Sequence, residues 1–345
     1  MEKQSNNIRI HHARILSMTK DTSDRSSELP VIHGEIHICN DKITYVGDPR
    51  FAPSADWDRE IDADGNIIMP GFKNAHTHSG MTFLRSYADD LPLQNWLYDK
   101  VFPLEALLTP EDIYWCSRLA IMEYLTSGIT ANFDMYQKTD AIVRASVDSC
   151  YRTVLCGSVN NFVSSVEELE QNYLRYNNYD PLISSQLGFH AEYTTSEELL
   201  HGIADLSHKY KAPVYTHNSE TADEVSDCVK RTGYTPTVYM ERLGLLDHGG
   251  GGFHCVHMTE EDLDIYKEKG LWVVTNPSSN LKLASGIAPL THMLDKGISL
   301  AIGTDGPASN NCLDMFREMF LTTALQKVTE QNASAMDANI VLRMA

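Results

Sequence analysis

Residues 67–78 read Ile-Ile-Met-Pro-Gly-Phe-Lys-Asn-Ala-His-Thr-His, a short apolar run that ends in two histidines. Side chains two positions apart on a strand point to the same face, so His76 and His78 at a strand end can share one metal ion. A lone His-x-His pair is weak evidence, because it arises often by chance. Its place at the end of an apolar run, after Pro70-Gly71, strengthens the interpretation as a metal-binding strand end.

Eight short apolar runs alternate with helix-like segments along the rest of the chain. They cover residues 67–75, 129–133, 153–159, 185–190, 213–216, 252–256, 271–275 and 298–302. Strands that are buried on both faces have this continuous apolar character. Helix-start patterns at Thr109, Thr195 and Thr259 separate the runs. Eight strand–helix units predict an α/β fold, a (β/α)₈ TIM barrel over residues 66–345.

A doubly wound sheet is the alternative, but no Gly-x-Gly-x-x-Gly follows the first run. The glycine run at 249–252 does not indicate a phosphate loop, because it precedes a strand and no Gly-Lys-Ser/Thr follows it. We expect it to be a flexible lead into the sixth strand.

Residues 1–65 have a different sequence pattern from the rest of the chain. Segments 8–16, 31–39 and 42–46 are rich in β-forming residues, and Asn40-Asp41 supplies a turn between the last two. This region predicts a small β-sandwich-like domain with no chemistry of its own.

The composition excludes several classes of partner. The 345 residues include 28 Lys and Arg against 47 Asp and Glu, for a net charge of −19. A surface this acidic repels phosphate backbones and anionic lipid. We therefore expect no nucleic-acid or membrane partner. No apolar run is long enough to cross a bilayer. Seven scattered cysteines without a Cys-x-x-Cys pair favour reduced thiols in a cytoplasmic protein.

Polar side chains gather where the barrel strands should end, which is where such barrels carry their active sites. They are His76, His78, His190, His217, Glu220, His254 and Asp305. His217 and Asp305 complete a His₃Asp set with His76 and His78, and its nitrogen and oxygen donors suit one divalent metal. Zn²⁺ fits best and Fe²⁺ is the alternative. Such a metal keeps a position for water and lowers its pKa toward ~7.

Longer motifs carry a family resemblance. The stretch Pro70-Gly71-Phe72-Lys73-Asn74-Ala75-His76-Thr77-His78 resembles the opening metal motif of the amidohydrolase superfamily. The continuation from Met81 to Leu91, with Trp96 and Glu105, is similar to the S-adenosylhomocysteine/5′-methylthioadenosine deaminase family, close to the triazine chlorohydrolases. Further matches are His217-Asn218-Ser219-Glu220, His254-Cys255-Val256-His257, Asn276-Pro277-Ser278-Ser279-Asn280-Leu281-Lys282-Leu283 and Gly303-Thr304-Asp305-Gly306-Pro307-Ala308-Ser309-Asn310-Asn311.

The resemblance implies a hydrolase that deaminates an adenine nucleoside: 5′-methylthioadenosine, adenosine or S-adenosylhomocysteine. His76, His78, His217 and Asp305 would bind the metal, and Asp305 would also accept a proton from the metal-bound water. Glu220 would pass a proton to a ring nitrogen, and His254 would orient the attacking hydroxide. The products would be the inosine compound and ammonia.

The resemblance also implies substrate contacts by Trp96, Glu105 and His190, with Glu220 at the ring. For Trp96 the alternative is a buried anchor that holds its loop down. One departure concerns the loop after the third strand, residues 157–162, which reads Gly-Ser-Val-Asn-Asn-Phe. Family members that act on S-adenosylhomocysteine offer an arginine there to pair with its carboxylate. Its absence favours a neutral 5′ group.

A second departure is at the C-terminus. The family continues past the eighth strand with elements that complete the small β-domain, whereas this sequence stops at Ala345. We expect a sheet that lacks its usual second half, either through truncation or with a homo-oligomer contact in its place. Two alternative functions stay open: an amino- or chlorohydrolase for a triazine or guanine-type ring, and a truncated metal-binding scaffold without catalysis.

Overall fold

The computed structural model describes residues 6–19 and 29–345. The chain divides into two compact units, Met1–Gly71 and Phe72–Ala345, whereas the sequence indicated a division after residue 65. The difference arises because the expected run 67–75 is split. Ile67–Ile68 forms strand β5 of the small unit, and Phe72–Thr77 forms β6 of the large one. Pro70 lies between them and has no N–H to donate to a ladder.

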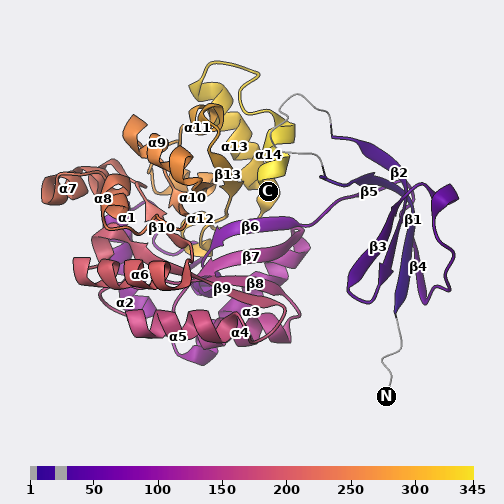
Figure 1. The fold of residues 1–345 in the computed structure, drawn as a ribbon, viewed down its shortest axis with the longest axis horizontal. Helices are drawn as coiled ribbons and strands as arrows, with labels where there is room; N and C mark the ends of the chain where they lie inside the picture. The colour runs from indigo at the N-terminus through magenta and orange to yellow at the C-terminus, as the bar shows by residue number, and fades with distance from the viewer. Residues whose placement is uncertain (1–5, 20–28) are drawn as a thin grey trace. The chain divides into compact units, whose positions relative to one another are not determined.

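The small unit is one sheet with the strand order β3-β2-β1-β4, and β5 pairs with β1 (Figure 1). Its strands are β1 (Asn7–Leu16), β2 (Val31–Cys39), β3 (Lys42–Gly47), β4 (Arg59–Asp62) and β5 (Ile67–Ile68). Ala13, Ile15, Ile36 and Ala63 form its buried core. A one-turn 3₁₀ helix at Pro49–Phe51 follows β3. The three predicted strands are therefore present.

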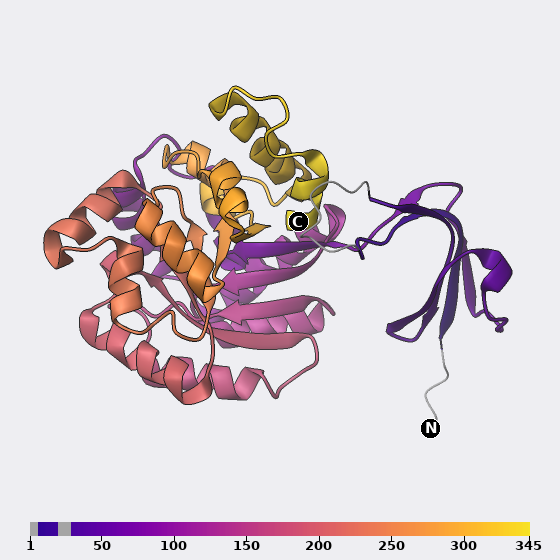
Figure 2. The ribbon, with the colours of Figure 1, turned by 45° about the horizontal axis from the view of Figure 1, so that its top comes forward.

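The large unit is the predicted barrel. Eight parallel strands follow the order β6 to β13 without a crossover, and β13 returns beside β6 (Figures 1 and 2). The strands are β6 (Phe72–Thr77), β7 (Ile129–Met135), β8 (Arg152–Cys156), β9 (Ile183–Ala191), β10 (Val214–Asn218), β11 (Gly250–His254), β12 (Trp272–Thr275) and β13 (Ser299–Ile302). The (β/α)₈ prediction is confirmed.

The helices of the large unit follow its strands along the chain, and the longer ones lie outside the barrel, as Figure 2 shows. They are α1 (Leu93–Asn95), α2 (Phe102–Glu105), α3 (Pro110–Thr126), α4 (Thr139–Asp148), α5 (Val166–Tyr176), α6 (Glu197–Tyr210), α7 (Ala222–Thr232), α8 (Pro236–Arg242), α9 (Glu260–Lys269), α10 (Pro277–Lys282), α11 (Leu290–Lys296), α12 (Pro307–Asn310), α13 (Met315–Thr329) and α14 (Ala338–Met344). Shorter turns are the 3₁₀ helices Ser79–Leu84 and Glu192–Thr194 and the π-helix Trp96–Val101.

The helix starts follow the sequence signals closely. Thr109 and Thr259 form reciprocal capping boxes at the starts of α3 and α9. At α6 the cap is Ser196 rather than Thr195, one residue later than expected. None of the described helices has the length and apolarity that a bilayer crossing requires. All seven cysteines are free thiols.

The glycine run is part of the barrel, which corrects the expectation of a flexible lead at 249–252. Gly250 to Gly252 belong to β11 and pair with β10. A Cβ on Gly250 would lie 1.8 Å from the Val214 carbonyl oxygen, and its φ of +125° is a conformation that side chains disfavour. Glycine here therefore permits close approach of two backbones.

Side-chain hydrogen bonds join the first and last barrel strands. The Asn74 Nδ2 donates to the Thr304 hydroxyl at 2.7 Å, and the Thr304 N–H donates to Asn74 Oδ1 at 2.9 Å. Both residues are buried. Asn74 thus provides the hydrogen-bond partner for the backbone N–H of Thr304, which lies between β13 and Asp305.

Replacement of Asn74 by leucine should lower the free energy of unfolding by about 1–3 kcal/mol, because it leaves the buried N–H of Thr304 without its hydrogen-bond partner. Urea unfolding followed by circular dichroism measures the change. Asn339→Leu, at an exposed position on α14, is the matched control and should change stability by less than about 0.5 kcal/mol. Equal stability of the two variants would contradict this role of Asn74.

Candidate metal and catalytic site

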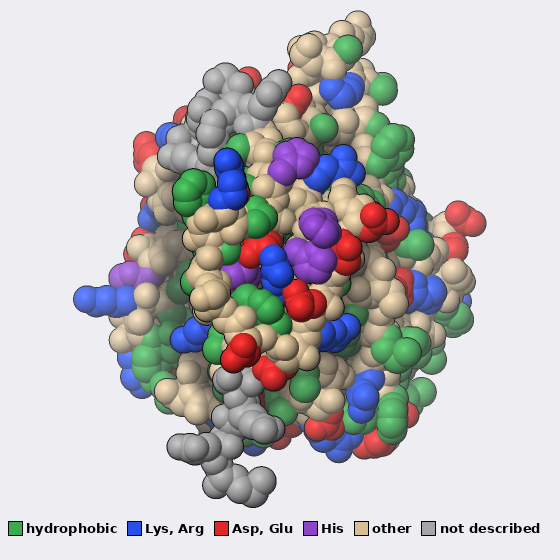
Figure 3. Space-filling model, turned by 90° about the vertical axis from the view of Figure 1, so that its right-hand side faces the viewer, with side chains coloured by type: hydrophobic (Ala, Val, Ile, Leu, Met, Phe, Trp, Pro, Cys, Tyr) green, Lys and Arg blue, Asp and Glu red, His purple; other side chains and the backbone are tan. Residues whose placement is uncertain are grey.

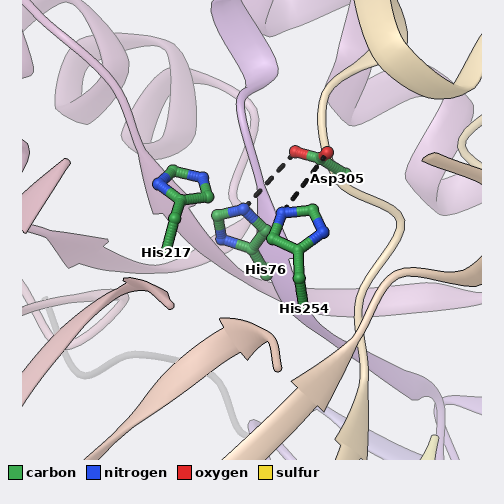
Figure 4. Close-up of side chains that lie close together, drawn as sticks. All are labelled: His76, His217, His254 and Asp305. Atoms are coloured by element: carbon green, nitrogen blue, oxygen red, sulfur yellow. Dashed lines mark ion pairs between the residues drawn. The ribbon is translucent and has the colours of Figure 1, made fainter. Parts of the chain in front are cut away.

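Four buried side chains from four strand ends meet at one point of the barrel (Figure 4). His76 lies on β6, His217 on β10 and His254 at the end of β11, and Asp305 follows β13. One ligand atom from each lies within 4.8 Å of the others. The parallel topology explains this, because it brings the carboxyl ends of all eight strands to one rim.

His78 lies at the same point, although it is outside that mutual group of four. Its Nε2 is 3.1 Å from Asp305 Oδ1, closer than the Nε2 of His76 at 3.4 Å. The Nε2 of His254 is farther from the carboxylate, 3.9 Å from Oδ2, and lies 3.8 Å from Glu220 Oε2. The sequence-predicted His76, His78, His217 and Asp305 therefore come together, with His254 beside them between two carboxylates.

Hydrogen bonds orient three of these imidazoles. The Nδ1 of His217 donates to the His190 carbonyl at 2.6 Å, and that of His78 donates to the Met135 carbonyl. The Nδ1 of His254 pairs with Asn280 Oδ1 at 2.7 Å. Since a carbonyl only accepts, each Nδ1 carries the proton and each Nε2 keeps its lone pair for a metal or a substrate.

His76 supplies the test of whether a metal fits. Its ring is fully buried, stacks on Phe253 at 3.7 Å, and neither nitrogen makes a hydrogen bond to any described residue. Burial lowers the pKa of His76 to about 3, so the ring is neutral at ordinary pH. A buried nitrogen without a hydrogen-bond partner destabilises the fold. A cation bound in the cluster would give one of the two His76 nitrogens a partner. The donor set therefore fits a divalent metal.

Asp305 is held as a carboxylate. Its Oδ2 accepts hydrogen bonds from the Ser279 and Ser309 hydroxyls at 2.6 and 2.8 Å, and its Oδ1 accepts from the Gly306 N–H at 2.8 Å. Burial alone would raise the pKa of Asp305, but the interactions with His76 and His78 outweigh it and hold the pKa well below its usual range.

Glu220 lies just beyond β10 and is 4% exposed. Its Oε1 accepts from the Ser285 hydroxyl at 3.0 Å. Burial raises the pKa of Glu220, which suits a group that exchanges protons. The Glu224 carboxylate fixes its backbone by accepting from the N–H groups of Ser219 and Glu220 at 2.8 and 2.7 Å.

The backbone around the site adopts an uncommon conformation. Four non-glycine residues have positive φ: Ser219 (51°), His254 (72°), Cys255 (50°) and Asp305 (58°). Each such residue costs free energy that the surrounding packing must offset, and residues of this kind cluster at functional sites. Here the turns aim His254 and Asp305 inward at the strand ends.

A cavity of about 420 Å³ opens above the metal-binding residues. It is mostly apolar, and its walls include the three predicted substrate contacts, Trp96, Glu105 and His190. The Trp96 Nε1 and the Glu105 Oε1 are buried and make no hydrogen bond to a described residue. Burial raises the pKa of Glu105 to about 7. Polar atoms of this kind are free to bind a ligand.

Several residues that build the site carried no role in the sequence analysis. Asn280 orients His254, Ser279 and Ser309 hold Asp305, and Ser285 holds Glu220. All four lie in or beside the motifs at 276–283 and 303–311. Those motifs were visible in the sequence, but nothing in single-residue spacing shows which hydroxyl or amide contacts which ligand.

A second grouping of metal-ligand residue types lies on the small unit. His11, His12 and Asp62 approach one another, with His12 Nδ1 3.0 Å from Asp62 Oδ1. His12 is exposed, and Figure 3 shows histidine side chains beside acidic and basic ones on this face. Contacts between exposed histidine and carboxylate side chains are common without a bound ion.

The comparisons with known proteins agree with this geometry. The model of the amidohydrolase family matches residues 67–345. A 5-methylthioadenosine/S-adenosylhomocysteine deaminase from Desulforamulus reducens is 40% identical over 348 residues, which cover 99% of this chain and 78% of the relative. The zinc-bound structure of an adenosine deaminase from Xanthomonas campestris is 33% identical, with a TM-score of 0.88 and coverage of 98% and 77%.

The chain belongs to the amidohydrolase family, as the resemblance predicted. A triazine hydrolase structure from Arthrobacter also superposes, with a TM-score of 0.88 over 99% of this chain and 81% of that one, but at 22% identity. That likeness shows the fold alone and does not favour the triazine alternative.

The metal content of two alanine variants tests whether His78 or His254 is the metal ligand. We expect His78→Ala to lose most of its bound divalent metal, because an inward-facing ligand is removed, and His254→Ala to keep it. Elemental analysis by mass spectrometry of the purified variants measures the ratio of metal to chain. His201→Ala, on the exposed face of α6, is the control. Metal loss in His254→Ala but not in His78→Ala would reverse the assignment.

Proposed function

We propose that this protein is a metal-dependent aminohydrolase that converts an adenine nucleoside to the corresponding inosine compound and ammonia. The observation that carries the proposal is the convergence of Glu220, His254 and Asp305 beside the metal-binding histidines at the floor of an apolar cavity. The relative named above supports 5-methylthioadenosine or S-adenosylhomocysteine as substrate, and the Xanthomonas structure supports adenosine.

His76, His78, His217 and Asp305 would hold one divalent metal, Zn²⁺ by preference and Fe²⁺ as the alternative. The support is the all-nitrogen and oxygen donor set, the unpartnered nitrogens of His76 and the zinc in the Xanthomonas relative. When bound, such an ion lowers the pKa of water and so supplies a nucleophile near neutral pH.

The side chains around it divide the proton transfers. Asp305 would accept a proton from the attacking water, because its carboxylate lies beside the metal-binding histidines. Glu220, with its raised pKa, gives a proton to a ring nitrogen of the adenine and so makes the C6 carbon electron-poor. His254, held by Asn280, directs its Nε2 toward the reacting oxygen. The proton that Asp305 accepted then passes to the amino group, which leaves as ammonia, and the hydroxyl proton on C6 returns to Glu220.

The cavity walls would bind the nucleoside away from the reacting carbon. Glu105 would accept hydrogen bonds from both ribose hydroxyls, and His190, which lies beside His217 with ring centroids 4.8 Å apart, would contact the nucleoside. Trp96 is 4% exposed and offers an indole N–H in the same cavity. These assignments support a bound nucleoside rather than a small bare ring.

Ammonia release tests the proposal directly. The purified chain with Zn²⁺ is incubated with adenosine, 5′-methylthioadenosine, guanine and an amino-chloro-triazine. We expect turnover of the adenine nucleosides, seen as ammonia release and as the ultraviolet change from adenine to hypoxanthine. Turnover of the triazine or guanine alone, or bound metal without turnover of any substrate, would contradict it.

Glu220→Gln should reduce kcat about 10²–10⁴-fold while the metal content stays near that of the unchanged protein, because the amide cannot transfer the proton. Steady-state kinetics together with elemental analysis measure both quantities. Glu261→Gln on the exposed start of α9 is the matched control. A Glu220→Gln variant that keeps more than half of the activity would remove Glu220 from the mechanism.

A further inference from the structure

A buried carboxylate on α13 joins two short helices beside the site. Glu318 is fully buried, although glutamate is rarely found in a protein interior without partners. Its Oε2 accepts a hydrogen bond from the Ser278 N–H at 3.0 Å, and its Oε1 accepts one from the Asn310 Nδ2 at 2.8 Å. Ser278 lies in the first turn of α10, and Asn310 is the last residue of α12. One side chain therefore holds two segments that β13 separates in the sequence.

The start of α10 needs a hydrogen-bond partner from outside the helix. Its N-cap residue, Asn276, makes no side-chain cap hydrogen bond, and Pro277 at the first helical position has no N–H. The N–H of Ser278 is thus the first one of the helix, and the first N–H groups of a helix have no carbonyl partner within it. The carboxylate of Glu318 supplies the missing acceptor.

Both helices carry residues that contact the proposed catalytic groups. From α10, the Ser279 hydroxyl donates to Asp305 Oδ2 at 2.6 Å, and the Asn280 Oδ1 pairs with the Nδ1 of His254 at 2.7 Å. From α12, the Ser309 hydroxyl donates to the same Asp305 oxygen at 2.8 Å. Ser279 and Ser309 are each directly next to a residue that the α13 carboxylate binds. A shift of either helix would therefore move a hydroxyl that contacts Asp305.

The amide of Asn310 also holds the turn that presents Asp305. Its Nδ2 donates to the Thr304 carbonyl at 2.6 Å as well as to Glu318. Asp305 has a φ of 58°, a left-handed conformation that costs free energy in a residue other than glycine. Interactions with the surrounding structure must offset this cost. Glu318 contributes because it fixes the amide that binds the turn.

We infer that Glu318 is a positioning residue, which holds α10 and α12 so that Asp305 and His254 keep the geometry needed for deamination. The inference rests on the proposed function, in which those two side chains act at the metal end of the cavity. Glu318 is not one of the described residues that line the cavity, so it acts through the two helices rather than on the substrate.

Glu318→Gln tests the inference, because it keeps the shape of the side chain and removes one acceptor. The amide retains one oxygen, which can accept from Ser278 or from Asn310 but cannot hold both donors as the carboxylate does. Loss of residues that orient metal ligands has effects of about 10- to 100-fold, so we expect kcat to fall by a factor in this range and KM to change less than about threefold. Burial raises the pKa of Glu318 to about 7, so the assays are run above that pH, where the carboxylate is ionised.

Glu330→Gln, at the exposed C-cap of α13, is the matched control and should change neither kcat nor KM. A Glu318→Gln variant with kcat within about threefold of the unchanged protein overturns the inference and leaves the deaminase proposal intact. An equal loss through KM alone also overturns it, because positioning of Asp305 and His254 acts on the chemical step.

Hydrogen–deuterium exchange of the metal-free protein gives a second readout that needs no turnover. In Glu318→Gln we expect faster amide exchange in at least one of the segments 276–283 and 303–311. Exchange in β9, which lies opposite β13 in the strand order, should stay unchanged. Unchanged exchange in both segments overturns the inference, and so does equal acceleration in every strand, which indicates a general loss of stability.

The two readouts separate failure of the inference from failure of the proposed function. If the unchanged protein deaminates no adenine nucleoside, the proposed function fails, and the exchange measurement still decides whether Glu318 holds the two helices. If Glu318→Gln does not fold, Glu318→Asp replaces it, because it keeps the charge but is shorter by one methylene group and cannot reach both donors. We expect Glu318→Asp to show the same fall in kcat and the same local exchange, and values equal to those of the unchanged protein overturn the inference.

Discussion

The carboxylate of Asp305 is the group on which the site depends. It lies within 4 Å of ring nitrogens of His76 on β6, of His78 just after β6 and of His254 at the end of β11. Two serine hydroxyls and a backbone N–H also donate hydrogen bonds to this buried carboxylate. A buried carboxylate is costly without a countercharge, and a bound cation would supply one.

Much of this arrangement was predictable from the sequence. Eight apolar runs identified the barrel strands, and polar residues directly after them identified the rim, because parallel strands end on one side. His76, His78, His217 and Asp305 were found by this rule. The split of the run at 67–75 was not found, because apolar character alone does not show which of two sheets a short strand joins. The β11 glycines were misinterpreted for a related reason: only the packing against Val214 shows why side chains are excluded there.

The residues that hold the metal-binding and catalytic side chains in place could not be predicted from the sequence. Asn280, Ser279 and Ser285 come from the turn region after β12, yet each holds a residue from a different strand. Hydroxyls and amides are too common for their partners to be inferred from spacing. The same holds for the cavity. Its acidic and histidine residues could be predicted from the sequence motifs. The placement of the aromatic wall residues Tyr98 and Phe162 could not, because it depends on how their segments fold over the rim of the barrel.

The most direct test of the account is the position of the metal in a crystal of the purified, zinc-loaded protein, located by anomalous scattering at the zinc edge. If these residues bind one ion, the anomalous map should show a single strong peak. We expect it about 2.0–2.2 Å from the Nε2 atoms of His78 and His217 and from a carboxylate oxygen of Asp305. No peak at these residues, or one that is bound only at the His11 and His12 pair, would contradict it.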